Sequence, residues 1–201
     1  MSTIKKSGFT LRKEKRENQE KQKGIVLWFT GLSASGKTTI ANELEKLLYK
    51  NDNHSYILDG DVFRDGLSSD LTFDRRSREE NLRRVKYVAE MFCDAGIITL
   101  VTFISPFQKD REKVRSLLKS KYIEIYVCVS LQVAEDRDPK GLYKKARSGE
   151  IKDFTGIDSP YDIPLSPEIT LLTEKDSASL CAKQVFEYLV NGGFVIRSNQ
   201  V

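Results

Sequence analysis

The stretch GLSASGKTT at residues 31–39 constrains the fold more than any other part of the chain. It matches the pattern G-x-x-x-x-G-K-[ST] in full and directly follows the apolar run at residues 25–29. The glycines of this pattern turn backbone N–H groups toward one anion, the lysine reaches the β- and γ-phosphates, and the hydroxyl ligates Mg²⁺. We therefore predict a loop that binds a nucleoside triphosphate through Gly31, Leu32, Ser33, Ala34, Ser35, Gly36, Lys37, Thr38 and Thr39, with Lys37 in catalysis and Thr38 at the metal.

Short apolar runs alternate with helical patterns over the rest of the chain. A run that is apolar throughout is typical of a strand buried on both faces of a parallel sheet. Alternating strands and helices predict an α/β fold, a doubly wound parallel sheet of the P-loop NTPase and nucleotide-kinase kind, with ligands beyond the carboxyl ends of its strands. The predicted strands are residues 24–29, 55–58, 97–104, 122–129 and 169–172.

A capping box predicts where the helix after the second strand begins. Ser77 and Glu80 stand three residues apart, as the serine and glutamate of a capping box do, and Leu82 and Val85 continue an apolar stripe. Gly96 is expected to end this helix. A helix is also expected directly after the phosphate loop, where Ile40, Leu44, Leu47 and Leu48 have helical spacing. Two further helices are expected over residues 108–119 and before Gly192.

The termini and the charge distribution indicate one domain with a basic arm. Residues 1–23 hold eight of the 33 Lys and Arg residues and three of the 29 Asp and Glu residues, so the remaining 25 basic and 26 acidic residues nearly balance. We expect a flexible, solvated arm at 1–23 and a kinase domain at 24–201. Residues 13–23, KEKRENQEKQK, are polar throughout and lack interleaved aromatics, so we do not expect a nucleic-acid partner. No secretory h-region and no apolar run of membrane-spanning length is found, and we expect a cytoplasmic protein without a membrane partner.

Residues 137–167 are rich in glycine, proline and charge, and they are too long for a plain connection. Loops of this length inside a compact domain are usually lids or binding loops. The chain has no N-K-x-D segment to read guanine, which favours ATP as the donor. A small-molecule kinase closes such a lid over the transferring phosphoryl group. The sequence therefore predicts a kinase of small-molecule nucleotide substrates that uses Mg²⁺.

Acidic and basic residues after the second strand are candidates for the acceptor site. Asp59 and Asp61 leave the end of that strand, where one carboxylate could organise Mg²⁺ and the other could accept the proton of the acceptor hydroxyl. We favour Asp61 as the base or metal organiser. Arg78 and Asn81 are three residues apart near a helix start, where, with Arg64, they could bind an anion.

Several segments, in this order, resemble the adenylylsulfate kinase family. They are the phosphate loop, DGDVFRDGL, SDLTF, REENLRRV, FISPF and DPKGLYKKARSGEIKDFTGIDSPYD, and the resemblance covers residues 24–172. It implies transfer of the ATP γ-phosphoryl group to the 3′-hydroxyl of adenosine 5′-phosphosulfate, in sulfate assimilation or the supply of a sulfate donor. It also suggests a homodimer.

The resemblance assigns roles to particular residues. Phe73 and Phe154 would stack on the adenine of the acceptor, and Arg137 and Lys140 of the lid would approach the phosphates. Ser105 matches a position described as a phosphoserine intermediate, although in-line transfer needs no covalent intermediate and no base is near Ser105 in the sequence. The implied acceptor-binding set is Asp59, Asp61, Arg64, Phe73, Arg78, Asn81, Ile104, Ser105, Lys140 and Phe154.

Departures from the family pattern are confined to the acceptor side. Val62 and Phe63 follow Asp61 where the family commonly has Asn and an aliphatic residue, and Asp65 replaces a histidine. Two alternatives therefore stay open. One is a 3′-kinase of another nucleotide acceptor, such as a cytidine diphosphate derivative for polysaccharide modification. The other is a nucleotide-binding regulatory module that transfers no phosphate.

Overall fold

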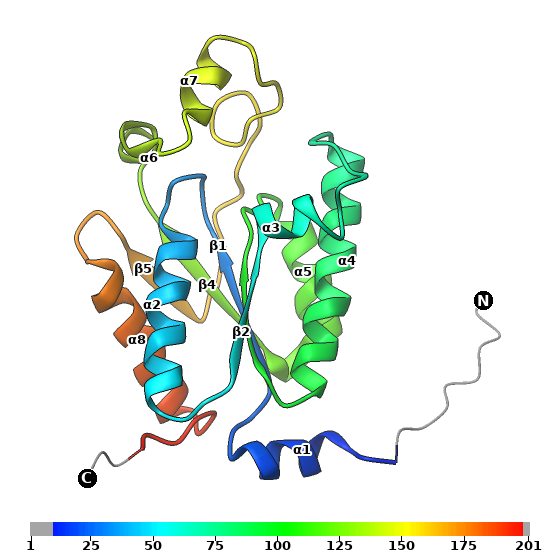
Figure 1. The fold of residues 1–201 in the computed structure, drawn as a ribbon. Coiled ribbons are helices and arrows are strands. Elements are labelled where there is room, and N and C mark those ends of the chain that lie inside the picture. The colour runs from blue at the N-terminus through cyan, green and yellow to red at the C-terminus, as the bar shows by residue number, and fades with distance from the viewer. Residues whose placement is uncertain (1–9, 199–201) are drawn as a thin grey trace, which may run out of the picture.

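Five parallel strands form the centre of the computed structural model, which describes residues 10–198 (Figure 1). Their order across the sheet is β2-β3-β1-β4-β5, and every neighbouring pair is parallel. The predicted doubly wound sheet is confirmed. The strands are β1 (Ile25–Thr30), β2 (Ser55–Asp59), β3 (Ile98–Thr102), β4 (Tyr122–Cys128) and β5 (Ile169–Leu172).

Alternate residues of β1 hold two helical layers against the sheet. Ile25, Leu27 and Phe29 join the apolar cluster that contains α2 (Lys37–Lys50) and α8 (Ala178–Asn191). Val26 and Trp28 join the cluster on the opposite face, with α4 (Arg75–Asp94) and α5 (Gln108–Leu118). Figure 1 shows these two pairs of helices on opposite sides of the sheet. All six residues of β1 are buried, as the continuous apolar run predicts.

The strand order places a functional edge beside β1. Strands β3 and β4 flank β1, so the chain leaves β1 in one direction and returns on its other side. Such a switch point opens a crevice at the carboxyl ends of the strands. The phosphate loop follows β1, the short helix α3 (Gly60–Asp65) follows β2, and a turn through Ser105 follows β3.

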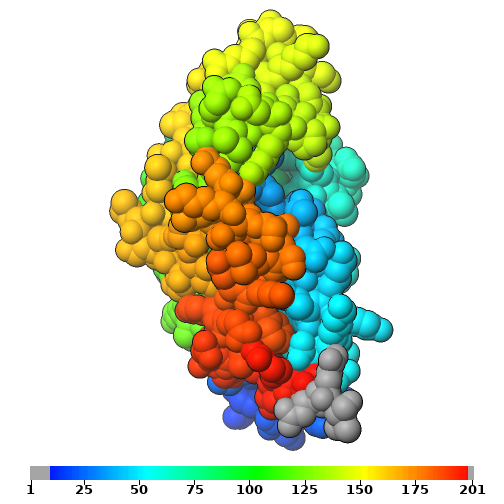
Figure 2. Space-filling model, turned by 90° about the vertical axis from the view of Figure 1, so that its left-hand side faces the viewer, coloured from blue at the N-terminus to red at the C-terminus, as the bar shows by residue number. Residues whose placement is uncertain are grey.

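The predicted lid segment lies above this edge. It follows α6 (Leu131–Arg137) and contains α7 (Leu142–Arg147). Tyr143 and Phe154 belong to a third apolar cluster, and Leu32 and Ala34 of the phosphate loop pack against it. In Figure 2 the lid forms the upper end of the molecule, above α2 and α8. The lid thus has a small core of its own that touches the phosphate loop.

Part of the N-terminal arm differs from its prediction. Helix α1 (Lys13–Glu20) lies against the end of the sheet opposite the lid (Figure 1). Arg16 pairs with Asp94 at 2.6 Å, and the buried Gln22 side chain donates to the carbonyl oxygens of His54 and Gly96, both at 2.8 Å. These long-range contacts have no signature in the local sequence. The arm's residues 1–9 lie outside the described part.

The start of α4 corrects the predicted capping box. The N-cap is Asp74, whose side chain accepts from the backbone N–H of Ser77 at 3.1 Å. Ser77 is the third helical residue, and its hydroxyl donates back to Asp74 at 2.7 Å. The helix therefore begins one turn earlier than predicted. Aspartate and serine both favour the N-cap position, and the Asp74 carboxylate places a negative charge at the positive end of the helix dipole.

One short element completes the fold. A single 3₁₀ turn at Lys119–Lys121 connects α5 to β4. Within residues 10–198, no helix combines the length and apolar character needed to cross a membrane.

Candidate active site

The phosphate loop joins β1 to α2 and is closed around its own lysine. Lys37 Nζ donates to the carbonyl oxygens of Gly31 at 3.0 Å and Leu32 at 2.7 Å, and to Ser35 Oγ at 3.3 Å. Gly36, the N-cap of α2, has φ 101°, a conformation that favours glycine. The loop therefore brings the N-terminus of α2 and the Lys37 ammonium group to one position, where both would favour an anion.

Burial changes the titration of Lys37. Only 8% of the side chain is exposed, and loss of solvent lowers its pKa from 10.5 to about 8. The negative charges of Asp59 and Asp61 act in the opposite direction but do not offset the burial. A polyphosphate would supply the negative charge that this ammonium group lacks.

Asp59 is the acidic residue that contacts the phosphate loop. Its Oδ2 accepts from the hydroxyls of Thr38 and Thr102, both at 2.8 Å. Its Oδ1 accepts from the backbone N–H of Asp61 at 2.9 Å, so Asp59 also caps α3. Partial burial acts to raise the pKa of Asp59, but these hydrogen bonds outweigh it and the pKa lies below its usual value. Asp59 is therefore held ionised beside Thr38.

Asp61 faces the lid. Its Oδ2 pairs with Lys140 Nζ, which joins α3 to the segment between α6 and α7. The hydrogen bond that Lys140 donates to the Asp61 carboxylate raises the pKa of Lys140. The structure thus separates the two carboxylates, with Asp59 on the phosphate loop and Asp61 on the lid.

The two arginines predicted for the acceptor site lie on different elements, and both contact Phe73. The Arg64 guanidinium carbon is 4.3 Å from the centroid of the Phe73 ring, and 62% of Phe73 is exposed. Arg78 Nε donates to the Phe73 carbonyl at 2.6 Å, and its Nη1 donates to Thr155 Oγ1 at 3.0 Å. Partial burial lowers the pKa of both arginines, with their mutual repulsion as a further cause for Arg64. A bound anion would relieve this repulsion.

Asn81 lies one turn beyond Arg78 on α4. It is 3% exposed, and its Oδ1 atom has no hydrogen-bond partner within the described residues. A buried carbonyl oxygen of this kind is a free acceptor for a donor group on a ligand.

The two phenylalanines predicted to stack on adenine have different surroundings. Phe73 is covered on one face by Arg64, whereas Phe154 is 9% exposed and meets Tyr143 edge-on at 5.0 Å between ring centroids. The Tyr143 hydroxyl donates to the Ser33 carbonyl at 3.0 Å, so the lid ring under Phe154 is fixed to the phosphate loop.

Ser105 lies in the turn after β3, with only 4% of its surface exposed. Its backbone has φ 40°, and its Oγ accepts from the indole N–H of Trp28 at 3.0 Å. The Ile104 carbonyl beside it accepts from Thr30 Oγ1 at 2.7 Å. An indole N–H is a donor only, so it cannot act as a base toward this hydroxyl.

Arg137 reaches the phosphate loop indirectly. Its Nη2 donates to the Thr173 carbonyl at 2.5 Å, and the Thr173 hydroxyl donates to the Ser35 carbonyl at 3.0 Å. Thr173, Thr102 and Tyr143 are site residues that the sequence reasoning missed. Thr102 is the last residue of β3, and Thr173 directly follows β5. A hydroxyl at the carboxyl end of an apolar strand is the signal that could have identified both.

Comparisons with known proteins bear on this arrangement. A model described as adenylylsulphate kinase matches residues 23–172. The chain is 56% identical over 179 residues to an adenylyl-sulfate kinase of Clostridium acetobutylicum, covering 89% of this chain and 90% of the relative.

Two solved structures are also similar. One is the Mycobacterium tuberculosis APS kinase in complex with AMPPNP and APS, with TM-score 0.81, 43% identity and coverage of 84% of this chain and 98% of the other. The second is the hexameric APS kinase from Thiobacillus denitrificans, with TM-score 0.68 and 25% identity. The match covers 91% of this chain and 32% of the other chain. On the family match and the identity to curated relatives, the chain belongs to the adenylylsulphate kinase family.

Proposed function

We propose that this protein transfers the γ-phosphoryl group of ATP to the 3′-hydroxyl of adenosine 5′-phosphosulfate. The products are ADP and 3′-phosphoadenosine 5′-phosphosulfate, and the hydroxyl proton leaves the acceptor as the new P–O bond forms. The membership of the family and the 56% identity to an adenylyl-sulfate kinase support this activity. The observation that carries it is the position of Asp59. Its side chain accepts a hydrogen bond from Thr38 of the phosphate loop and also caps α3, the helix that contains Arg64.

The donor side rests on the phosphate loop and the lid. Backbone N–H groups of residues 31–39 and the Lys37 ammonium group would bind the β- and γ-phosphates. Arg137, held on Thr173, would lie on the donor side of the loop. Tyr143 would keep the lid in register with Ser33 when the lid encloses the site.

The residues beside Lys37 suit Mg²⁺. The Thr38 hydroxyl and the Asp59 carboxylate are hard oxygen donors, joined at 2.8 Å. The described residues contain no cluster of three or more His, Cys, Asp or Glu side chains of metal-site geometry, and Mg²⁺ commonly takes few protein ligands beside water and phosphate. Bound there, Mg²⁺ would neutralise charge on the phosphates. We assign Thr38 and Asp59 to the metal and leave Asp61 as the proton acceptor.

The acceptor side combines cations with a free amide oxygen. Arg64 and Arg78 would bind the phosphosulfate group, because guanidinium groups pair well with such anions. The Oδ1 of Asn81, which has no hydrogen-bond partner among residues 10–198, is suited to a hydroxyl or amino donor of the acceptor. Phe73 and Phe154 would bind the adenine, and Lys140 would exchange its pairing with Asp61 for the incoming substrate. The surroundings of Ser105 support direct transfer rather than a phosphoserine intermediate.

An ADP-release assay tests the function. The protein is given ATP and Mg²⁺ with adenosine 5′-phosphosulfate, and in parallel with cytidine and uridine 5′-diphosphate compounds. We expect turnover of the adenylyl sulfate and little of the pyrimidines. Selective turnover of a pyrimidine would show that the departures at Val62, Phe63 and Asp65 have changed the acceptor. ATP binding without transfer to any compound would show a regulatory module instead.

Assembly and cellular location follow from the same proposal. The hexameric relative supports self-association of this chain, and a homodimer is the form that we propose. The cytoplasm and the sulfate-assimilation role remain predictions.

A further inference from the structure

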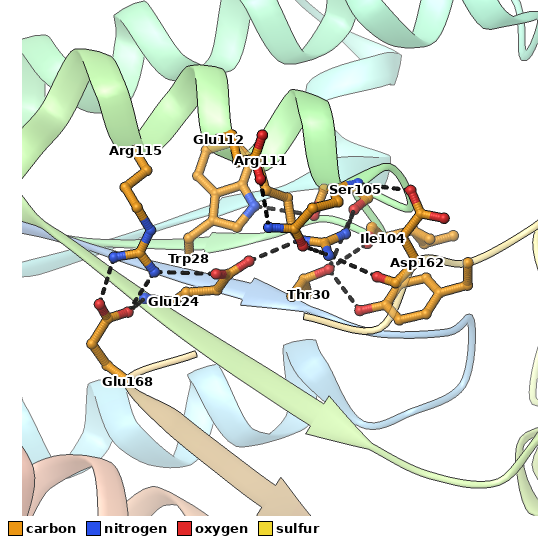
Figure 3. Close-up of polar contacts among 12 residues, drawn as sticks. Trp28, Thr30, Ile104, Ser105, Arg111, Glu112, Arg115, Glu124, Asp162 and Glu168 are labelled. Carbon is orange, nitrogen blue, oxygen red and sulfur yellow. Dashed lines mark hydrogen bonds and ion pairs between the residues drawn. The ribbon is translucent and has the colours of Figure 1, made fainter. Parts of the chain in front are cut away.

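Arg111 is a buried arginine outside the phosphate loop (Figure 3). It lies on α5 with 1% of its surface exposed. Its Nε donates to Glu124 Oε1 at 2.8 Å, and its Nη1 donates to the Ser105 carbonyl at 2.8 Å. Its Nη2 donates to Gln108 Oε1 at 2.6 Å and to the Asp162 carbonyl at 2.7 Å. One side chain therefore connects α5, β4, the turn after β3 and the segment that leads away from the lid.

That last segment, residues 159–168, is the C-terminal part of the predicted lid together with the next residue, and it is called the return segment because it leads back to β5. It is joined to the Ser105 turn by more than Arg111. The Asp162 backbone N–H donates to the Pro106 carbonyl at 2.8 Å, and its Oδ2 accepts from the Gln108 backbone N–H at 3.0 Å. The Tyr161 hydroxyl is 2.9 Å from Thr30 Oγ1, directly before the phosphate loop. The return segment is thus bonded to the last residue of β1 and to the turn that follows β3.

A second arginine on α5 fixes the other end of the return segment. Arg115 Nη2 lies 3.1 Å from Glu124 Oε2, and its Nη1 lies 2.5 Å from Glu168 Oε1. Glu168 Oε2 accepts from the Glu124 backbone N–H at 2.7 Å. Glu124, 3% exposed, therefore lies between two guanidinium groups, as Figure 3 shows.

Stability alone gives a weak reason for this arrangement. Apolar residues of similar volume often replace a buried ion pair at no loss of stability, because both charges lose water on burial. An apolar residue cannot bind the two carbonyl oxygens, however. The Arg111 fork donates in several fixed directions, which the smaller ammonium group of lysine does not reproduce. The distinctive property of Arg111 is that it fixes the Ser105 and Asp162 carbonyls relative to each other.

We propose that Arg111 is a positioning residue for acceptor binding. It holds the Ser105 turn and the return segment in one geometry, so that the lid closes over a preset acceptor surface. Arg78 meets the same lid at Thr155, four residues before the return segment begins. In this role Arg111 acts through the two carbonyl groups that it binds and not through a contact with the acceptor. The kinetic test of this inference rests on the proposed function, because the quantity measured is the acceptor KM.

The Arg111→Lys variant is the first test, assayed with ATP and adenosine 5′-phosphosulfate. Losing hydrogen bonds from a charged donor to the two carbonyls is expected to raise the acceptor KM by about tenfold or more. The affinity for an ATP analogue, measured by calorimetry, is expected to stay within about twofold of the wild type, because the phosphate loop makes no hydrogen bond to Arg111.

A double variant separates positioning from stability. In Arg111→Met/Glu124→Met both buried charges are replaced, and we expect the Tm to recover toward the wild-type value relative to Arg111→Met alone. The acceptor KM is expected to stay raised, because the carbonyls still lack their donor. Recovery of the acceptor KM together with the Tm would show that Arg111 acts only through stability, and would overturn the proposal.

Leu189→Ala is the matched control for a loss of packing. Leu189 is fully buried on α8, in the apolar cluster on the other side of the sheet. It should lower the Tm and leave the acceptor KM unchanged. An equal rise in acceptor KM for Leu189→Ala and Arg111→Lys would contradict the positioning role, as would an unchanged acceptor KM in Arg111→Lys.

Hydrogen exchange tests the inference without turnover. The Asp162 amide bonded to Pro106 should lose protection in Arg111→Lys, while the amides of α8 keep theirs. Unchanged protection at Asp162 would overturn the inference even if the wild type proves to be a kinase. A wild type that does not phosphorylate the adenylyl sulfate would refute the proposed function alone, and the exchange result would still decide the role of Arg111.

Discussion

Lys37 is the residue whose chemistry most directly couples binding to pH. Its ammonium group donates to two backbone carbonyls and a hydroxyl, and burial lowers its pKa to about 8. The unfolded chain keeps the usual lysine pKa, so between these two values the unfolded state binds more protons. The free energy of unfolding of the ligand-free protein therefore gains a contribution that rises with pH in that window.

The first prediction concerns proton uptake on ATP binding. The phosphates favour charged Lys37, so above about pH 8 binding should take up a proton and the Kd should rise with pH. We expect the Kd to rise more than about tenfold from about pH 7.5 to about pH 9.5. Calorimetry in buffers of different ionisation enthalpy measures the uptake. Lys37→Met should bind weakly and lose this pH dependence, and the same dependence in the variant would assign it to another group.

The second prediction separates the two aspartates. Asp59→Asn should lower kcat/KM by at least about a hundredfold and raise the Mg²⁺ concentration needed for half-maximal rate, because the carboxylate bonded to Thr38 is lost. Asp61→Asn should lower kcat without changing that Mg²⁺ requirement. Rates measured across a Mg²⁺ titration distinguish the two. An altered Mg²⁺ requirement in Asp61→Asn alone would reverse the assignment.

At the scale of elements, local patterns predicted most of the fold. Apolar runs identified all five strands, and helical spacing identified α2, α4, α5 and α8. The predicted start of α4 was wrong by three residues, because Asp74 and Ser77 both suit an N-cap and the sequence does not say which of them takes that position. The separation of Asp59 from Asp61 also escaped prediction, since it depends on α3 and on Lys140, 79 residues further along the chain.

The third prediction belongs to the α4 cap. Asp74→Ala should lower the Tm more than Ser77→Ala, because Asp74 accepts both the Ser77 N–H and its hydroxyl. The first turn of α4 carries Arg78, so Asp74→Ala should also raise the acceptor KM. Asp74→Asn keeps an N-cap residue and should be milder than Asp74→Ala. Thermal melts and acceptor titrations on the three variants check this order, and a larger effect of Ser77→Ala would restore the serine as the cap.

At the scale of the whole molecule, contacts distant in sequence decide what local patterns leave open. Arg111 and Asp162 are 51 residues apart, and Gln22 reaches His54 and Gly96 from an arm that reads as solvated. Hydrogen bonds from side chains to distant carbonyls produce no periodicity and no motif. The apolar pattern therefore predicts the layers of the fold, whereas the hydrogen bonds that connect distant segments are seen only in the three-dimensional structure.

The fourth prediction tests the docking of the arm. Gln22 donates to two carbonyls and accepts from the His54 N–H at 2.7 Å. Gln22→Ala leaves these buried groups unpaired and should lower the free energy of unfolding by about 1–3 kcal/mol. The kinetic constants should stay near those of the wild type. Urea denaturation measures the change, with the exposed Gln19→Ala as control. An equal effect of both variants would mean that Gln22 is not an anchor of the arm.

Strand β1 contributes side chains to both apolar layers and ends at the phosphate loop. Complete unfolding of either layer would therefore remove one of the two apolar faces that hold this strand, and we expect both layers to melt together with the phosphate loop. Catalytic activity should consequently serve as a reporter of global unfolding. On heating, loss of turnover and loss of circular dichroism should follow one curve, so that a simple rate measurement reads the stability of the entire chain.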